Sequence, residues 1–377
     1  MFTVNMKLVR LFSIAIFAII LSLFSFSSIQ AQGEFINEQP FEETLEGTVI
    51  EIIDEKEVET GDERHLYQKL KILITKGSLK DQIVSVKSGE FMSVGIPRYE
   101  KGNKLVISFT KDLEGNDMFY ITDYVRRSAL LWLFIIFAVL AVVVGKIWGI
   151  TSILGMGFSF LVIFKFILPQ IINGANPVFI AIVGSFFIIP VTFYLSHGFN
   201  KKTHIAIIGT VIALIITGLL AAIFVEASKL TGYSSEEAAF LQFEKQGSIN
   251  MEGLLLAGII IGTLGVLDDV TVSQSAIVFR LNEVNKKLGF KKLYKQAMMV
   301  GHDHVSSMVN TLVLVYTGAT LPLLLLFINN PRPFSELINY EIIADEIVRT
   351  LVGSIGLVLA VPITTFLAVS IIVNKSR

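Results

Sequence analysis

The sequence predicts an all-α polytopic membrane bundle with a small extracytoplasmic β-rich domain near its N-terminus. Hydrophobic residues make up 53% of the 377-residue chain and charged residues only 17%, a balance outside the range of soluble proteins. The second half of the chain consists largely of apolar stretches of about 20 residues, the length that crosses a bilayer. Before them lies a charged region in which apolar and polar residues alternate, the pattern of short strands.

The first residues are typical of an export signal. Lys7 and Arg10 precede an apolar run from Leu11 to Ile29, which is followed by polar residues. This order fits a signal peptide or a signal-anchor helix over residues 1–31, and the sequence leaves both open. In either case we expect the following segment to be exported.

Residues 32–127 are expected to form the extracytoplasmic β-rich domain. In one stretch Leu70, Ile72 and Ile74 alternate with polar residues, the period of a half-buried strand. Five such stretches, separated by glycines, are enough for a small barrel or sandwich. They cover residues 48–53, 66–75, 82–86, 105–109 and 118–122. No catalytic constellation is present among them.

Residues 128–377 are expected to form the transmembrane domain, with about seven helices. The apolar stretches cover residues 129–147, 150–168, 177–196, 205–225, 253–279, 305–328 and 351–373. If the β-rich domain lies outside, the connections that fall inside carry most of the Lys and Arg residues, as the positive-inside rule requires. We therefore expect a multi-pass protein of the bacterial plasma (inner) membrane, with the C-terminus in the cytoplasm.

Several classes of chemistry are excluded by missing residues and motifs. The chain has no cysteine, so it forms no disulfide, thiolate nucleophile or Cys-based metal centre. It also lacks a phosphate-binding Walker loop, a dinucleotide-binding glycine motif and a zinc-protease helix motif. We expect no cofactor, no enzyme activity and no nucleic acid partner, since anionic lipid explains the basic stretch from Arg280 to Lys295.

The fifth apolar stretch contains two neighbouring acids. Its apolar start, Gly253 to Leu267, covers only about 22 Å as a helix, so to span it must continue through Asp268 and Asp269. A carboxylate in lipid costs a few kcal/mol and by default faces the bundle or a hydrated cavity. Asp269 lies on a stripe of small residues that we expect to pack against other helices. The stripe contains Gly258, Gly262, Gly265, Asp269, Ser273 and Ala276.

The sixth and seventh stretches complete a predicted polar site. The sixth is expected to begin near Gly301 and to carry a polar face with Asn310. The seventh repeats the small-residue pattern with Gly353, Gly356, Ala360, Thr364 and Ala368. We expect stretches five to seven to form one core, with Asp268, Asp269, Asn310 and Thr364 around an internal site that couples to protons or cations. A structural role of the two acids, as a helix cap or an interhelical contact, is the alternative.

A metal site at His302, Asp303 and His304 is a weaker alternative. Residues two apart on a helix point about 200° away from each other, so one metal could use both histidines only on a non-helical backbone. A turn before the helix, with Asp303 at the helix N-terminus, explains the same residues.

Three motifs carry a family resemblance. They are GVLDDVTVSQ from Gly265 to Gln274, the run from Gly301 through Asn310 to Leu312, and GATLPLLLLF from Gly318 to Phe327. With them the chain resembles the YibE/F-like family of bacterial integral membrane proteins. The resemblance implies an exported N-terminal domain followed by a multi-helix region, and it implies no particular activity. A looser similarity to the resistance-nodulation-division permeases and to SecD and SecF suggests proton coupling.

Three functions stay open at this point. The first is an ion- or proton-coupled permease or exporter component, a transporter in which Asp269, assisted by Asp268, exchanges protons or binds cations. The second is a non-catalytic scaffold or assembly factor that acts through the exported domain. The third is an intramembrane metal-dependent hydrolase. The expected partners are the lipid bilayer, H⁺ or another cation, an unknown substrate, and a second copy or another membrane protein.

Overall fold

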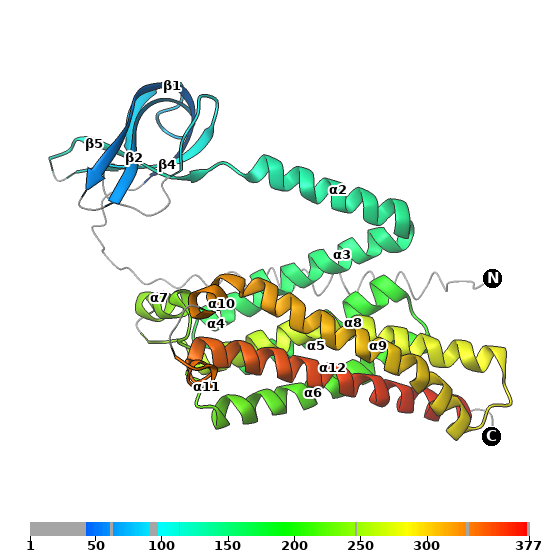
Figure 1. The fold of residues 1–377 in the computed structure, drawn as a ribbon. Coiled ribbons are helices and arrows are strands. Elements are labelled where there is room, and N and C mark those ends of the chain that lie inside the picture. Colours follow the sequence, from blue (N-terminus) through cyan, green and yellow to red (C-terminus); the bar gives the residue numbers. More distant parts are fainter. Residues whose placement is uncertain are drawn as a thin grey trace. The chain divides into compact units, whose positions relative to one another are not determined.

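The computed structural model describes residues 43–60, 63–90, 97–112, 114–245, 247–328 and 332–374 (Figure 1). The predicted signal segment, residues 1–31, lies outside the described residues. The described chain falls into two compact units, and the boundary between them lies within helix α2, between Val139 and Leu140.

Five antiparallel strands build the N-terminal unit, as the alternating pattern predicts. They are β1 (Glu43–Thr60), β2 (Glu63–Lys76), β3 (Ile83–Ser88), β4 (Lys104–Lys111) and β5 (Asp117–Tyr124). The sheet order is β3-β2-β1-β4-β5, so β1 is central and pairs with both β2 and β4. The two outer strands, β3 and β5, also approach each other, which curls the sheet toward a partly open barrel.

The core of this unit follows from the strand period. Leu70, Ile72 and Ile74 are completely buried, as expected. Leu70 pairs with Val86 and Ile72 with Val84 across β2 and β3, so apolar residues meet on one face. Each of the five strands includes the stretch predicted for it or, for β3, all but its first residue, and each extends further along the chain.

The secondary-structure elements that follow the sheet are all helices. The elements are α2 (Arg127–Gly145), α3 (Ile147–Val162), the π-helix η1 (Ile163–Ile167), α4 (Leu168–Ile172), α5 (Pro177–His197), α6 (Lys201–Ala227), α7 (Glu236–Glu244), α8 (Met251–Val284), α9 (Phe290–Ala319), α10 (Leu321–Ile328), α11 (Phe334–Leu337) and α12 (Glu341–Asn374). Among the described residues, six helical segments are long and apolar enough to cross a membrane. They are α2, the run from α3 to α4, α5, α6, α8 and α12.

The sixth predicted stretch, residues 305–328, is a bent pair and not one straight helix. The helices α9 and α10 together satisfy the criterion for a span, but they meet at an angle of 71°. Pro322 contributes to the break because it has no backbone N–H for the helical bond to Gly318. Counting this pair, the bundle has up to seven candidate spans among the described residues, in agreement with the sequence.

The predicted start of this helix near Gly301 is wrong. The helix α9 begins at Phe290, after Gly289, so Gly301 to His304 lie in its interior and Asp303 is at no helix N-terminus. The cause is the amphipathic segment before Gly301. Its charged residues lower its mean hydropathy, yet Leu293 and Ala297 are fully buried in an apolar cluster with residues of α12.

Asparagine side chains fix where three of the long helices begin. The side chains of Asn176, Asn200 and Asn250 accept hydrogen bonds from the backbone N–H groups of Phe179, Thr203 and Gly253, respectively. Each bond satisfies a donor that the first helical turn leaves free. These caps fix the N-terminal ends of α5, α6 and α8.

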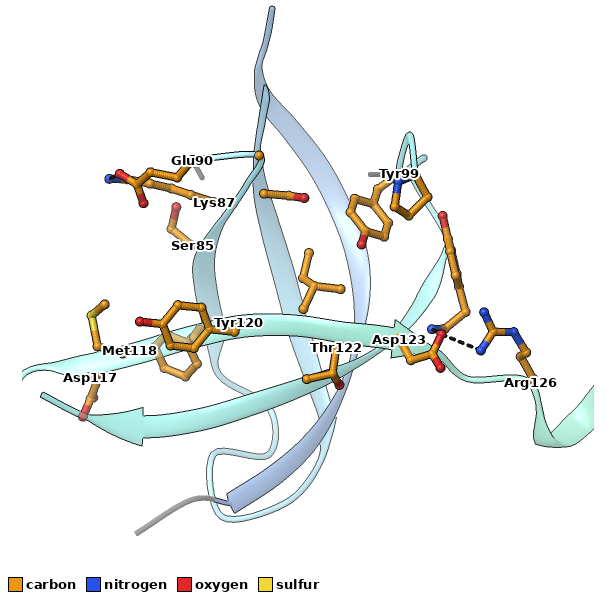
Figure 2. Close-up of a pocket in the computed structure, with 16 residues that line it drawn as sticks. Ser85, Lys87, Glu90, Tyr99, Asp117, Met118, Tyr120, Thr122, Asp123 and Arg126 are labelled. Carbon is orange, nitrogen blue, oxygen red and sulfur yellow. Dashed lines mark hydrogen bonds and ion pairs between the residues drawn. The ribbon is translucent and has the colours of Figure 1, made fainter. Parts of the chain in front are cut away.

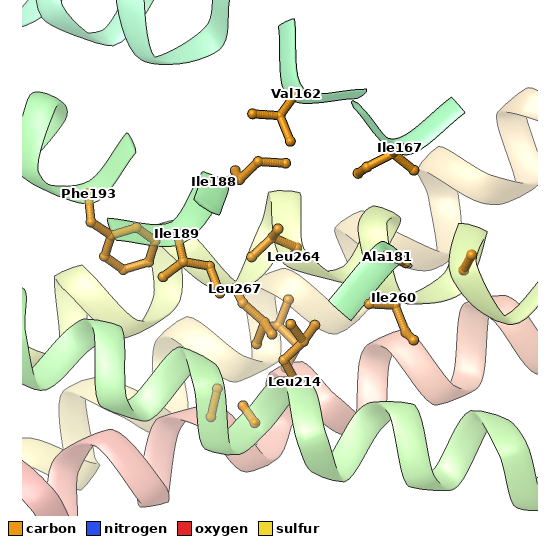
Figure 3. Close-up of a cluster of buried hydrophobic side chains, with 14 of the residues drawn as sticks. Val162, Ile167, Ala181, Ile188, Ile189, Phe193, Leu214, Ile260, Leu264 and Leu267 are labelled. Carbon is orange, nitrogen blue, oxygen red and sulfur yellow. The ribbon is translucent and has the colours of Figure 1, made fainter. Parts of the chain in front are cut away.

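The helical unit is centred on α6, α8 and α12, which pack against one another. Figure 3 shows its main apolar cluster, where Val162, Ile188, Leu214 and Leu264 from four different segments meet. Between α6 and α12 the backbones come close, because Gly356 lies against the side chain of Thr217 and Gly209 lies against that of Thr364. A Cβ atom at either glycine would overlap the threonine, so glycine is required at both positions.

Candidate functional site

The two neighbouring acids line a cavity of about 390 Å³ between α3, α5 and α8. Asp268 and Asp269 stand on the α8 wall, one turn after Gly265. The other walls supply hydroxyl groups and one imidazole, from Ser152, Ser159, Thr192, Ser196 and His197. The two acids therefore line a cavity whose walls combine these polar groups with apolar residues such as Ile188 and Leu264.

The closest charged partner of Asp268 is His197, the last residue of α5. The Asp268 Oδ1 atom lies 3.7 Å from the His197 Nε2 atom. The two side chains are about a third exposed, 33% for Asp268 and 37% for His197, but the Asp268 Oδ1 atom is itself buried. Within the described part of the chain, this oxygen accepts no hydrogen bond. A proton, a cation or a protonated imidazole would satisfy it.

A second cavity, of about 650 Å³, adjoins the first. The two share Ser152, Ser196 and His197, and the Oγ atoms of the two serines lie 3.4 Å apart. Asn200 and Lys202, at the start of α6, line the second cavity as well. The two cavities therefore meet at His197, one reaching toward the start of α6 and the other toward the acids.

Sequence reasoning missed His197. Its position at the end of another apolar stretch is recognisable, but nothing in the sequence shows which residue of α8 it meets. Consecutive residues of a helix differ in direction by about 100°, so Asp268 and Asp269 can each have a partner of its own. The partner of Asp268 is on α5 and not on the sixth or seventh stretch.

Asn310 and Thr364 do not join this site. Asn310 is exposed on α9, and Thr364 is completely buried against Gly209 of α6. The face of α8 that meets α6, α9 and α12 carries other polar groups. Gln274 Nε2 donates to Thr365 Oγ1 at 2.7 Å and to the Ala297 carbonyl at 3.1 Å, and the hydroxyls of Thr210 and Thr271 lie 2.7 Å apart. Helices α8, α9 and α12 pack against one another as expected. The hydrogen bonds of Gln274 stabilise this packing, whereas the two acids face the cavity next to α3 and α5.

The two small-residue stripes also differ. Gly353 and Gly356 of α12 are buried, as the packing prediction requires. On α8, Gly258, Gly262 and Gly265 are exposed, and Cβ atoms at Gly258 and Gly265 would have no described atom within 4 Å. Among the described residues the α8 stripe therefore shows the expected packing only at Gly262, where a Cβ atom would lie 3.7 Å from the Tyr316 hydroxyl of α9. Ser273, further along, is half-buried.

The three residues of the alternative metal site lie on consecutive positions of helix α9. His302 and Asp303 are exposed and His304 is half-buried, as helical geometry separates them. Among the described residues, no group of three His, Cys, Asp or Glu side chains could hold a metal ion. The described part of the chain therefore offers no metal-ligand cluster for the hydrolase alternative.

The N-terminal unit has a groove of its own, of about 750 Å³, between β3 and β5 (Figure 2). Lys87, Tyr99, Tyr120 and Asp123 line it. A hydrogen bond from the Tyr124 backbone N–H and another from Arg126 lower the pKa of Asp123, and burial raises the pKa of Tyr99. The groove is a mixed polar and aromatic surface and contains no catalytic group pair.

Six or seven long apolar helices define the class: they fit a multi-pass membrane protein. The family model described as YibE/F-like protein matches residues 133–374, more than half of the chain, and the chain belongs to this family. The resemblance seen in the sequence motifs is thereby confirmed. No curated protein and no solved structure matches the chain.

Proposed function

We propose that this protein is an ion- or proton-coupled permease or exporter component in which Asp268 and His197 form the coupling pair. The single observation that carries the proposal is the 3.7 Å approach of these two side chains inside a polar cavity of a helical bundle. Asp269, exposed on the same wall, supplies a second carboxylate for the transported proton or cation.

The chemistry of the pair supports this role. An imidazole changes charge near neutral pH, and a carboxylate beside it gains an ion pair when the imidazole is protonated. A proton or cation that binds Asp268 competes with that ion pair, so occupancy of the acid and the charge of His197 are linked. Such a linkage between two groups on different helices is what coupling to a conformational change requires.

The arrangement of charges supports an orientation. Helix α6 begins with Lys201 and Lys202, and the positive-inside rule assigns this end of the helix to the cytoplasm. We propose that the cavity path from Lys202 to Asp268 opens to the cytoplasm of a bacterial plasma membrane. Residues 32–127 then lie outside and the C-terminus inside.

The test is ion flux in proteoliposomes that contain the full chain. Under an imposed pH or Na⁺ gradient, we expect flux above that of empty liposomes, and Asp268→Asn is expected to lower its rate by about tenfold, about 1.4 kcal/mol of activation free energy. Asp269→Asn and His197→Gln are expected to lower it less. Glu283→Gln, an exposed acid further along α8, is the matched control and should leave the rate unchanged. Absence of flux in the wild type, or equal rates in both acid variants and the wild type, would contradict the proposal.

A scaffold or assembly factor is the second candidate, and the groove between β3 and β5 favours it. Both strands are outer strands of the sheet, and an exposed strand edge is a template for a partner chain. A photo-crosslinking residue in place of Tyr120 in the full chain is expected to capture a partner protein in cells. The same residue in place of Glu100, exposed outside the groove, is the control.

A further inference from the structure

A third cavity of the helical unit, of about 480 Å³, lies where α8 and α12 begin and where α9 ends at its break with α10. Figure 1 shows α7, α10 and α11 gathered at this end of the bundle. The cavity walls combine three charged side chains, Asp345, Glu346 and Arg349, with a largely apolar surface from several helices. The apolar side is formed by Met251, Leu254, Leu255, Pro322, Leu323 and Ile342.

Asp345 lines this cavity and is the most deeply buried carboxylate of the described chain, at 4% exposure. One of its oxygens, Oδ2, accepts a hydrogen bond from the Ser234 hydroxyl. The other, Oδ1, has no hydrogen-bond partner in the segments that the structure describes. A buried carboxylate with one oxygen unsatisfied is costly unless a cation or a proton meets it.

The one neighbouring base of the lining is shared between two acids. Arg349 lies 3.6 Å from Glu346 and also acts electrostatically on Asp345, so its single charge does not offset both carboxylates. Glu341 accepts hydrogen bonds from the backbone N–H groups of Thr231 and Gly232 and thereby holds the α6–α7 connection against α12. Among the side chains that line the cavity, two acids therefore face one base, and the site favours positive charge.

The C-terminal end of α9 adds to the negative electrostatic potential of the cavity. Ala319 and Thr320, at the C-terminus of α9, line the cavity. A helix C-terminus carries partial negative charge and attracts cations within its last turn. The same arrangement, in which an interrupted helix directs its C-terminal end at a cation, is found at binding sites of membrane transporters.

The rest of the lining selects the kind of cation. An inorganic ion needs several free oxygen ligands. Other oxygens of the lining are engaged, because Glu346 pairs with Arg349, the Ser235 hydroxyl caps α7 and the Thr320 hydroxyl donates to the Tyr316 carbonyl. Asp345 and the Ser234 hydroxyl are left beside a wall of aliphatic side chains. The volume lies in the range of small-molecule pockets, in which apolar walls bind the body of a ligand and a few polar groups orient it. A cation with an apolar body satisfies both features.

We propose that this cavity binds an ammonium group that is carried by an apolar body, with Asp345 as the charge that anchors it. The ligand is a hydrophobic amine or quaternary ammonium, or the ammonium headgroup of a phospholipid. The proposal does not depend on ion coupling at Asp268, because binding can be measured without transport.

The test is calorimetric titration of the full chain with tetrapropylammonium, in nanodiscs made of phosphatidylglycerol, which has no ammonium group. We expect binding to the wild type and a rise in Kd of about tenfold or more for Asp345→Asn, which keeps the acceptor for Ser234 and removes the charge. Glu252→Gln is the matched control, because Glu252 is an exposed acid on the first turn of α8 and lies outside the cavity. No binding to the wild type, or equal binding to Asp345→Asn, would overturn the proposal.

A second variant guards against a folding defect of Asp345→Asn. Gly258 lines the same cavity, and a Cβ atom there meets no described atom within 4 Å, so Gly258→Phe fills the cavity without a backbone clash. We expect this variant to fold and to lose tetrapropylammonium binding, and retained binding would contradict the site. Displacement by equimolar K⁺ would overturn the apolar-body requirement. Weaker apparent binding in phosphatidylethanolamine nanodiscs would support a lipid ammonium as the ligand, and unchanged binding would support a free amine.

Discussion

Helices α8 and α12 carry nearly the same spacing of small residues, yet the structure uses the two stripes differently. On α12, Gly356 lies against Thr217 of α6 and is fully enclosed. On α8, Gly258 and Gly265 face open space and line two separate cavities. Small residues at helical spacing thus let something approach a helix closely, and the spacing alone does not say whether a neighbouring helix or a ligand does so.

What distinguishes the stripes is the residue type that accompanies them. The α12 stripe continues into Thr364 and Ala368, which are buried, whereas the α8 stripe continues into Asp269, which is exposed. A carboxylate cannot be enclosed in an apolar contact without a partner, so the stripe that contains one stays open toward the cavity. The acid therefore marks the stripe that faces the cavities.

The largest expected effect is at Gly356. Replacing it with leucine puts a branched side chain where the Thr217 side chain already lies, and neither backbone can move away without disturbing the α6–α12 contact. We expect Gly356→Leu to lower the free energy of unfolding by about 3 kcal/mol or more, measured by denaturation in detergent micelles. Gly265→Leu on the open stripe is the control, and an equal loss there would break the distinction between the two stripes.

A smaller effect tests whether the α6–α12 contact is specific. Gly356→Ala is expected to be destabilising, and Thr217→Ala, which removes the overlapping hydroxyl, is expected to reduce that loss when both changes are combined. The coupling energy of the double-mutant cycle should be about 1 kcal/mol. Additive effects within error would show that the close approach of these two side chains does not limit the helix packing.

The smallest expected effect is at Gly265. Because a Cβ atom there meets no described atom within 4 Å, Gly265→Ala should leave packing intact and raise helix propensity, with a gain of up to about 1 kcal/mol in the free energy of unfolding. The measurement is thermal unfolding of the purified protein, with Gly262→Ala alongside, since Gly262 lies near the Tyr316 hydroxyl. A loss of stability at Gly265 would mean that this face is covered, by a second copy or another segment.

The sequence predicted the elements that depend on local pattern. Alternation at period two identified all five strands through residues such as Leu70 and Ile72, and hydropathy identified every apolar helix. It placed the start of α9 too late and left the first turns of α12 out of the last span. The segments beginning at Phe290 and Glu341 are charged enough to resemble loops, yet both are helical because one face is buried.

The candidate site was predicted only in part, because its contacts join helices that are distant in sequence. Asp268 and Asp269 were identified from the cost of a carboxylate in lipid, a property of the residues themselves. His197 could not be identified in this way, because its meeting with Asp268 depends on how α5 packs against α8. Asp345 was missed for a related reason. In the sequence it lies in a polar connection between two apolar stretches, and its burial depends on the contact with Ser234 and on the packing of the surrounding helices.

The paired contacts between α6 and α12 restrict how this bundle can move. Gly209 meets Thr364 and Thr217 meets Gly356, and the two contacts are eight residues apart on each helix, about 12 Å along the axis. Sliding one helix past the other by a single turn would remove both threonines from the glycines that make room for them. The paired contacts therefore oppose sliding of α6 along α12.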